Sequence, residues 1–415
     1  MRDVYVIGAG MTRFGKYMER NMKSLVEEAV TNTLKHAGID KSELQAAWVG
    51  NSAQGIVTGQ ESIRGQVVLR PLGIGAIPVM NVENACASAS SAFYGAWMGI
   101  ACGVYDVALA VGMEKLVQAD KKKMFETFWA ATDVEIMEAF KAMMKAEEEK
   151  KKQMGAKTAG EGGAGQSRSA FMDIYSMAAR NHMKKYGTTQ RQLAVISAKN
   201  HFHSSMNPYA QYQVNMTVEE VLAAPEISYP LTRPMCSPVG DGAAAAILCS
   251  KDYLKKIGDQ RPVKVRACVL ASGRDRDFNE EDIGGRLSRK AYEVAGVGPK
   301  DINVAEVHDA TAFGELHQTE ALGFCGEGEG GPFAESGATT LGGKVPVNTS
   351  GGLESRGHPI GATGLAQIAD LVWQLRGECG KRQVEGARFA LAENGGGNIG
   401  IEEAAMVITI LEKAF

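Results

Sequence analysis

Two segments of this 415-residue chain follow the same plan, and this internal similarity limits the fold more than any other feature. The first segment runs from Cys86 through an apolar helical pattern to the apolar run 107–112. The second runs from Ile360 through a similar pattern to the apolar run 389–392. Each has a small-residue turn, a helix, a glycine-containing loop and a short strand. Two copies of one α/β unit would direct two helix N-termini towards a shared crevice.

Short apolar runs alternate with helical patterns along most of the chain. Strands are expected at residues 4–7, 47–49, 107–111, 243–248, 263–270, 304–307 and 387–392. Apolar strands that alternate with helices are typical of α/β proteins whose sheets are covered on both faces. The first strand is followed by Gly8 and Gly10, but Arg13 stands where a dinucleotide-binding loop has its third glycine. The α/β fold class is therefore expected without a nicotinamide or flavin site.

The charge balance argues against several classes of partner. Lys and Arg number 45 and Asp and Glu number 48, which gives a formal charge of −3 and no electrostatic basis for binding nucleic acid or a membrane. The seven cysteines are scattered and include no CxxC pair, a pattern that indicates a reducing compartment without a disulfide framework or a zinc knuckle. A cytoplasmic protein without a leader or a membrane span is expected.

Residues 117–230 interrupt the alternation of strands and helices. An apolar stripe at helical spacing is followed by acidic residues 147–149, basic residues 151–152 and a glycine-rich run at 155–165. The stripe consists of Ile136, Met137, Phe140, Met143 and Met144. Two interpretations are open: the stripe packs against the body of the protein, or it forms a lid or a face for a partner chain.

Cys86 is the strongest candidate for a nucleophile. Its neighbours in residues 84–90 are too small to bury a thiol, and an apolar helical pattern with Phe93, Trp97 and Ile100 on one face follows it. Unpaired backbone N–H groups and the helix dipole would favour a thiolate at this helix N-terminus, so a lowered thiol pKa is expected. The alternative is that Cys86 is a small buried apolar residue.

Two histidines supply the partners that a reactive thiol needs. His358 lies in the glycine-rich turn 357–364 just before a helix, and we expect it to act as the base for Cys86. His308 lies at the end of an expected strand, where its imidazole can donate a hydrogen bond to a developing oxyanion. Either histidine alone could be structural, but together with Cys86 they form a candidate catalytic set.

The order of these motifs resembles the thiolase family over nearly the whole chain. The matching segments are residues 84–88, 308–309 with 320–323, 357–364 and 395–397, and residues 229–245 resemble the sterol-carrier-protein type of thiolase. The resemblance implies two similar α/β halves, residues 1–250 and 251–415, in a five-layered αβαβα arrangement. It also implies a lid insertion at about 117–230, a homodimer and an acyl-CoA substrate.

The resemblance assigns a role to each motif. Cys86 would attack the 3-keto carbon of a 3-oxoacyl-CoA in a retro-Claisen cleavage, and His358 would deprotonate first Cys86 and then coenzyme A. His308 would stabilise the enolate, and the backbone N–H groups of Cys86 and of Gly395, Gly396 and Gly397 would serve the tetrahedral intermediate. Coenzyme A is then a co-substrate, and no metal or redox cofactor is expected in this chain.

The chain departs from the family where a second cysteine is usual. Many thiolases carry that cysteine directly before the triple glycine, and this chain has Glu393 and Asn394 there. The sterol-carrier type has one two residues after its histidine, and Ala310 occupies that position. We expect Glu393 to act as general acid/base at the α-carbon. The alternative is that Glu393 is a solvated carboxylate and that water or His358 moves this proton.

Losing the second thiol suggests an unusual substrate. The chain is similar to the thiolase subunits that act on 2-benzoylsuccinyl-CoA in anaerobic toluene degradation, which implies benzoyl-CoA and succinyl-CoA as products. It also implies a partner subunit with an OB-fold and a zinc site, which would meet residues 121–166. Lys121 to Lys123, Arg168 and Arg180 either bind phosphate or form charged surface. The alternatives are a decarboxylating ketoacyl-synthase-type enzyme and an inactive acyl-CoA-binding scaffold.

Overall fold

The computed structural model describes residues 1–136, 138, 169–258, 261–277 and 280–415. Most of the predicted apolar stripe, the charged run 147–153, the glycine-rich run 155–165 and Arg168 lie outside the described residues. Among the described residues, no helix is long and apolar enough to cross a membrane.

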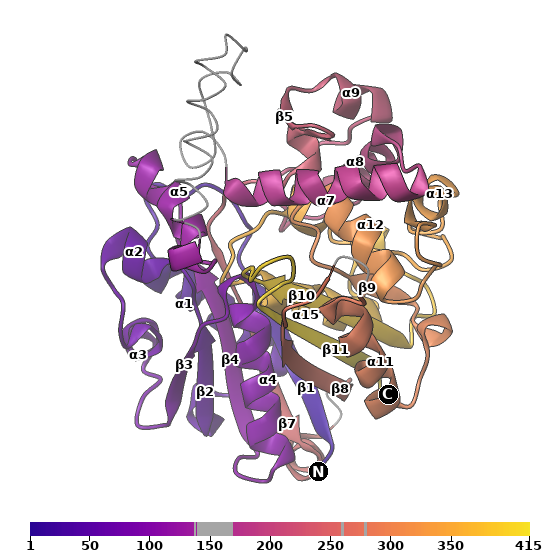
Figure 1. Cartoon of the computed structure of the whole chain (residues 1–415). Coiled ribbons are helices and arrows are strands. Elements are labelled where there is room, and N and C mark those ends of the chain that lie inside the picture. The colour runs from indigo at the N-terminus through magenta and orange to yellow at the C-terminus, as the bar shows by residue number, and fades with distance from the viewer. Residues whose placement is uncertain (137, 139–168, 259–260, 278–279) are drawn as a thin grey trace.

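One mixed sheet runs through both halves of the chain, in the order β3-β2-β4-β7-β1-β8-β11-β10-β9 (Figure 1). Its strands are β1 (Val4–Met11), β2 (Ala46–Gly50), β3 (Val79–Val82), β4 (Val107–Glu114), β7 (Gly242–Ser250), β8 (Val263–Ser272), β9 (Val304–Glu306), β10 (Phe389–Gly396) and β11 (Ala405–Lys413). The halves join where β1 pairs with β8 through Tyr5 with Lys264 and Val6 with Val263. The chain passes from one half to the other between β7 and β8, through α10 (Lys251–Ile257).

The two halves of the sheet have the same pairing pattern. In the N-terminal half, β2 and β4 are parallel, and β4–β7 and β7–β1 are antiparallel. In the C-terminal half, β9 and β10 are parallel, and β10–β11 and β11–β8 are antiparallel. A parallel bridge between Ala305 and Val347 stands where the N-terminal half has the β2–β3 pair. The predicted internal duplication is therefore present in the fold.

The order of the layers is given by the core cluster that each helix shares with the strands. Between the half-sheets lie α4 (Ser88–Ala101) and α15 (Thr363–Arg376), whose Phe93 and Leu365 share one core cluster with strand residues of both halves. On the outer faces lie α1 (Met22–Ala37), with Leu25 in the N-terminal core, and α11 (Ile283–Ala295), with Leu287 in the C-terminal core. This α/β/α/β/α arrangement confirms the predicted fold class.

The insertion covers the end of the sheet where both central helices begin (Figure 1). It contains α5 (Lys121–Trp129), α7 (Ala170–Tyr186), α8 (Gln190–Ser205), α9 (Val218–Ala223) and the small pair β5 (Glu226–Ser228) and β6 (Leu231–Thr232). Leu193 and Ile196 of α8 form a separate core with Leu316, which lies in α12 (Ala312–Ala321) of the C-terminal half. The insertion is thus fixed to the C-terminal half although its sequence belongs to the first.

Candidate active site

The N-termini of α4 and α15 meet at the centre of the molecule. Cys86 lies in a 3-10 turn, Ala85–Ala87, directly before α4, and His358 lies in the turn directly before α15. Gly364 permits this approach, because a Cβ there would come within 2.7 Å of the backbone nitrogen of Ser90. The two similar segments seen in the sequence therefore supply the two ends of one site.

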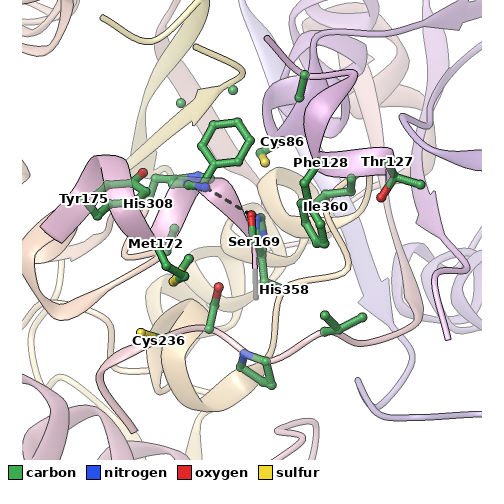
Figure 2. A pocket seen from close by; sticks show the side chains of 18 of the residues that line it. Cys86, Thr127, Phe128, Ser169, Met172, Tyr175, Cys236, His308, His358 and Ile360 are labelled. Atoms are coloured by element: carbon green, nitrogen blue, oxygen red, sulfur yellow. Dashed lines mark hydrogen bonds between the residues drawn. The ribbon is translucent and has the colours of Figure 1, made fainter. Parts of the chain in front are cut away.

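The structure brings Cys86, His308 and His358 together. The sulfur of Cys86 and a ring nitrogen of each histidine all lie within 4.8 Å of one another. The two imidazole rings stand edge to face, at 88° and with centroids 5.2 Å apart. Figure 2 shows the three side chains around one cavity, with Phe128 and Tyr175 also on its walls.

The tautomer of His358 is fixed by a threonine. Its Nδ1 lies 2.7 Å from Oγ1 of Thr363, and that hydroxyl donates its own hydrogen to the carbonyl of Pro359 at 3.1 Å. Because a hydroxyl has one hydrogen and the Pro359 carbonyl can only accept it, we assign Nδ1 of His358 as the donor to Thr363. The lone pair of His358 is therefore on Nε2, which is what a base requires.

Asn394 fixes His308 in the opposite tautomer. The side-chain amide of Asn394 donates to Nδ1 of His308 at 2.9 Å, and its oxygen accepts from the hydroxyl of Ser90. Nδ1 of His308 is therefore an acceptor and Nε2 bears the hydrogen. A nitrogen that bears a hydrogen has no lone pair for a metal, so this arrangement suits donation to an oxyanion better than metal binding. The sequence analysis gave Asn394 no role.

Burial favours the uncharged forms of Cys86, His308 and His358. Burial, together with the charges of Glu114 and Glu83, raises the pKa of the Cys86 thiol to about 12. Burial also lowers the pKa of His308 to about 4 and holds that of His358 well below its usual range, where His308 and Arg356 add to the effect. The expectation of a lowered thiol pKa is wrong, because desolvation outweighs the N–H groups near the sulfur. Cys86 therefore depends on His358 to lose its proton.

The glycine loop packs directly on the nucleophile's turn. A Cβ on Gly396 would lie 2.2 Å from the carbonyl oxygen of Asn84 and 2.4 Å from the nitrogen of Ala87. Gly395, Gly396 and Gly397 all line the cavity. The backbone N–H of Gly397 donates to the sulfur of Cys86. The use of the three glycine N–H groups by an oxyanion stays a prediction.

Glu393 lies behind the cavity rather than on its wall. It is fully buried, its Oε2 accepts the backbone N–H of His308 at 2.8 Å, and it is absent from the residues that line the cavity. The alternative of a solvated loop carboxylate is therefore wrong. Burial raises the pKa of Glu393 to about 8. This geometry favours support of the His308 backbone over direct proton transfer to a substrate.

The cavity has a volume of about 200 Å³, and most of its walls are apolar or aromatic. Its larger apolar side chains are Phe128, Phe171, Met172, Ile227, Val239 and Ile360. Arg233 is the one cationic residue and Glu403 the one carboxylic acid among its described lining residues. The sequence analysis missed Tyr175, Arg233 and Glu403, because each is brought to the site by tertiary packing.

Further lining residues bear on the earlier predictions. Cys236 also lines the cavity, but it packs with the apolar core around α8 and α12, and burial raises its pKa. Arg180 donates to the carbonyl of Tyr229 and is absent from the lining, as is Lys123. The structure thus gives neither of these cations a place in the cavity.

Most of the chain matches two models of one family. Residues 4–221 match the thiolase N-terminal domain, and residues 275–411 match the thiolase C-terminal domain-like family. The chain belongs to the thiolase family. It is 39% identical over 406 residues to an acetyl-CoA acetyltransferase of Methanothermobacter thermautotrophicus, covering 96% of this chain and 98% of that protein. This thiolase is accordingly an acyltransferase.

Two further relatives lie at similar distance. Human sterol carrier protein 2 is 38% identical over 427 residues, covering 100% of this chain and 73% of that protein. The benzoylsuccinyl-CoA thiolase subunit BbsB of Thauera aromatica is 37% identical over 391 residues, covering 92% of each chain. The predicted resemblance to sterol-carrier-type thiolases is confirmed.

A solved structure has the same fold at lower sequence identity. The Ltp2-ChsH2(DUF35) aldolase superimposes with a TM-score of 0.75 and 22% identity, over 98% of this thiolase and 97% of that chain. At this identity the similarity establishes the fold alone.

Proposed function

We propose that this thiolase cleaves a 3-oxoacyl-CoA with coenzyme A in a retro-Claisen reaction that passes through an acyl-Cys86 intermediate. The observation that best supports this reaction is that the two histidines beside the Cys86 thiol have opposite tautomers. His358 offers a lone pair at Nε2, and His308 offers a hydrogen at Nε2. A base and an oxyanion donor are what acyl transfer to a cysteine requires.

The reaction then follows from the three groups. His358 takes the Cys86 proton as the sulfur attacks the 3-keto carbon, and the bond between C2 and C3 breaks to leave the enolate of the shorter acyl-CoA. The Nε2–H of His308 donates to the enolate oxygen. The enolate takes a proton at C2 and leaves, and His358 releases the proton from Cys86 to solvent. His358 is then neutral again and deprotonates coenzyme A. The CoA thiolate takes the acyl group, and Cys86 regains a proton from His358.

Our candidate substrate is 2-benzoylsuccinyl-CoA. The BbsB relative is named for this reaction, and the cavity suits an aromatic acyl group because an apolar cavity of about 150 Å³ suffices for benzene. Arg233 is exposed, and the described structure gives its guanidinium no hydrogen bond or ion pair. Its position on the cavity wall suits the free carboxylate of a succinyl unit.

The substrate is tested by product analysis and by trapping. Wild-type protein with 2-benzoylsuccinyl-CoA and coenzyme A is expected to give benzoyl-CoA and succinyl-CoA, with a benzoyl mass added to the Cys86 peptide, whereas Cys86→Ser gives neither. Rapid turnover of acetoacetyl-CoA without any benzoylsuccinyl cleavage would reject the substrate. Consumption of malonyl thioester without coenzyme A would favour a ketoacyl-synthase-type enzyme. An inert wild-type protein would favour an acyl-CoA-binding scaffold.

Arg233 gives this substrate a second test. Arg233→Gln is expected to raise KM for 2-benzoylsuccinyl-CoA by about tenfold or more, since a charged hydrogen bond contributes about 1.5–3 kcal/mol. The same variant should leave KM for acetoacetyl-CoA within about twofold, because that substrate has no free carboxylate. Arg191→Gln is the matched control, since Arg191 is exposed and pairs with Glu219 away from the cavity. Equal effects on both substrates would remove the carboxylate assignment.

The proposed assembly is a homodimer that also binds a small OB-fold partner with a zinc site. Two names support the partner: BbsB is a subunit, and the solved neighbour is named for both Ltp2 and ChsH2(DUF35). All seven cysteines of this chain are free, which fits a cytoplasmic location. Light scattering of the chain alone and after co-expression with such a partner tests the assembly, and a monomer in both samples would contradict it.

A further inference from the structure

Glu403 places a carboxyl group on the wall of the catalytic cavity. It lies two residues before β11, and its side chain runs past Gly395, where an added Cβ would come within 3.1 Å of its Cγ. It shares the cavity with Cys86, His308 and His358. The glycine at 395 thus leaves room for an acid beside the glycine loop.

The Glu403 carboxyl group is free of the partners that fix its neighbours. Among the described residues, no other residue gives it a hydrogen bond or an ion pair. Glu402, directly before it, is fully buried and pairs with Arg276 and Arg286. Glu393 is bound to the backbone N–H of His308. Glu403 is therefore the carboxyl group here that can both reach the cavity and exchange a proton.

The surroundings of Glu403 favour its protonated form. Burial raises its pKa, an effect that nearby Asp282 and Glu402 reinforce and His317 opposes. Tyr175 of α7 also lines the cavity, and the charges of Glu403 and Cys86 both contribute to the raised pKa of its hydroxyl. Glu403 and the reactive thiol therefore face one region of the cavity from opposite halves of the chain. A carboxyl group whose pKa is raised is better suited to general acid catalysis than an ordinary surface carboxylate.

We propose that Glu403 is the general acid/base that exchanges the proton at the α-carbon, the role that a second cysteine has in other thiolases. This inference rests on the proposed retro-Claisen function. When the C2–C3 bond breaks, its electron pair remains on the enolate, and Glu403 gives its proton to C2 and becomes a carboxylate. His358 then releases to solvent the proton that it took from Cys86, and Glu403 takes a proton back from solvent. In the reverse direction Glu403 removes the C2 proton.

The test separates proton exchange from acyl transfer. Deuterium uptake at C2 of acetyl-CoA and succinyl-CoA in D₂O reports the proposed role. Exchange of benzoyl and acetyl groups between thioesters and free coenzyme A reports Cys86 and His358 alone. Glu403→Gln keeps the shape of the side chain, and Glu385→Gln, at an exposed carboxyl group outside the cavity lining, is the matched control. Glu393→Gln tests the rival acid, because its amide oxygen can still accept the N–H of His308.

Glu403→Gln is expected to slow deuterium uptake by about 10²- to 10⁴-fold, the usual contribution of general acid/base catalysis, with acyl exchange within about threefold of wild type. Glu385→Gln is expected to keep both rates within about threefold, and Glu393→Gln is expected to retain deuterium uptake well above that of Glu403→Gln. Uptake that survives Glu403→Gln, or that Glu393→Gln abolishes, would overturn the assignment to Glu403. Failure of acyl exchange in the wild type would instead reject the function on which the inference rests. Circular dichroism and thermal unfolding confirm that each variant is folded.

Discussion

Removing the hydroxyl of Thr363 should weaken the base without touching the substrate. Thr363→Val nearly preserves side-chain volume, but it deletes the acceptor that holds the hydrogen of His358 on Nδ1. A neutral hydrogen bond contributes about 0.5–1.5 kcal/mol, which corresponds to about a 2- to 13-fold preference for the catalytic tautomer. The same acceptor stabilises the imidazolium that forms when His358 takes the Cys86 proton, because Nδ1–H still donates to Thr363 in that state, so the proton transfer should slow by about the same factor.

The assay is the alkylation rate of Cys86 by iodoacetamide at pH 7, followed on the Cys86 peptide by mass spectrometry because six other thiols are present. Thr363→Ser is the control, since it keeps the hydroxyl and should alkylate within about twofold of wild type. Because Thr363 acts through His358, the acyl-exchange kcat should fall in Thr363→Val while KM stays constant. Alkylation at the wild-type rate in Thr363→Val, or an equal loss in Thr363→Ser, would refute the tautomer argument.

Three more predictions follow from the site. Asn394→Leu removes the amide that keeps the hydrogen of His308 on Nε2, and it should lower kcat by about 10²- to 10³-fold, the effect of losing an oxyanion donor; an unchanged kcat contradicts this role. Gly396→Ala forces a methyl group against the Asn84 carbonyl and should abolish Cys86 alkylation or destabilise the fold, so a stable, fully reactive variant would contradict the close packing. Folding raises the pKa of Glu393 from its ordinary value to about 8, so folded protein holds a proton that unfolded protein loses, and this contribution to stability disappears as pH rises through about 8. Urea unfolding should therefore show Glu393→Gln gaining stability relative to wild type between about pH 5 and 8, with little further gain above that, and a constant difference would argue against the raised pKa.

Local sequence patterns predicted the elements whose signal is continuous along the chain. Such signals predicted the apolar strands β1, β4 and β8. They also predicted the buried face of α4 with Phe93 and Ile100. The apolar run in β11 carried an equally clear signal but was not among the expected strands. The duplication could be predicted because both copies retain the turn, helix and strand order.

The chemistry of the site was only partly predictable. Cys86 and His358 stand out because glycine-rich or small-residue turns precede their helices. Asn394 and Glu403 have no local signature, since their roles depend on strands that meet only in the folded sheet. The thiol pKa was predicted in the wrong direction because dipole arguments are local, whereas desolvation is set by the whole surrounding structure.

The division of the site between α4 and α15 determines how this protein loses activity as it unfolds. The N-terminal half contributes the thiol and the C-terminal half contributes the base, so neither half is competent without the other, and activity depends on the contact between them. Progressive loosening at the Gly364–Ser90 contact would separate thiol from base while each sheet still held its own hydrogen bonds. Under mild denaturant, catalytic activity should be lost before secondary structure. Cys86 would then be inactive although α4, which follows it, is still folded.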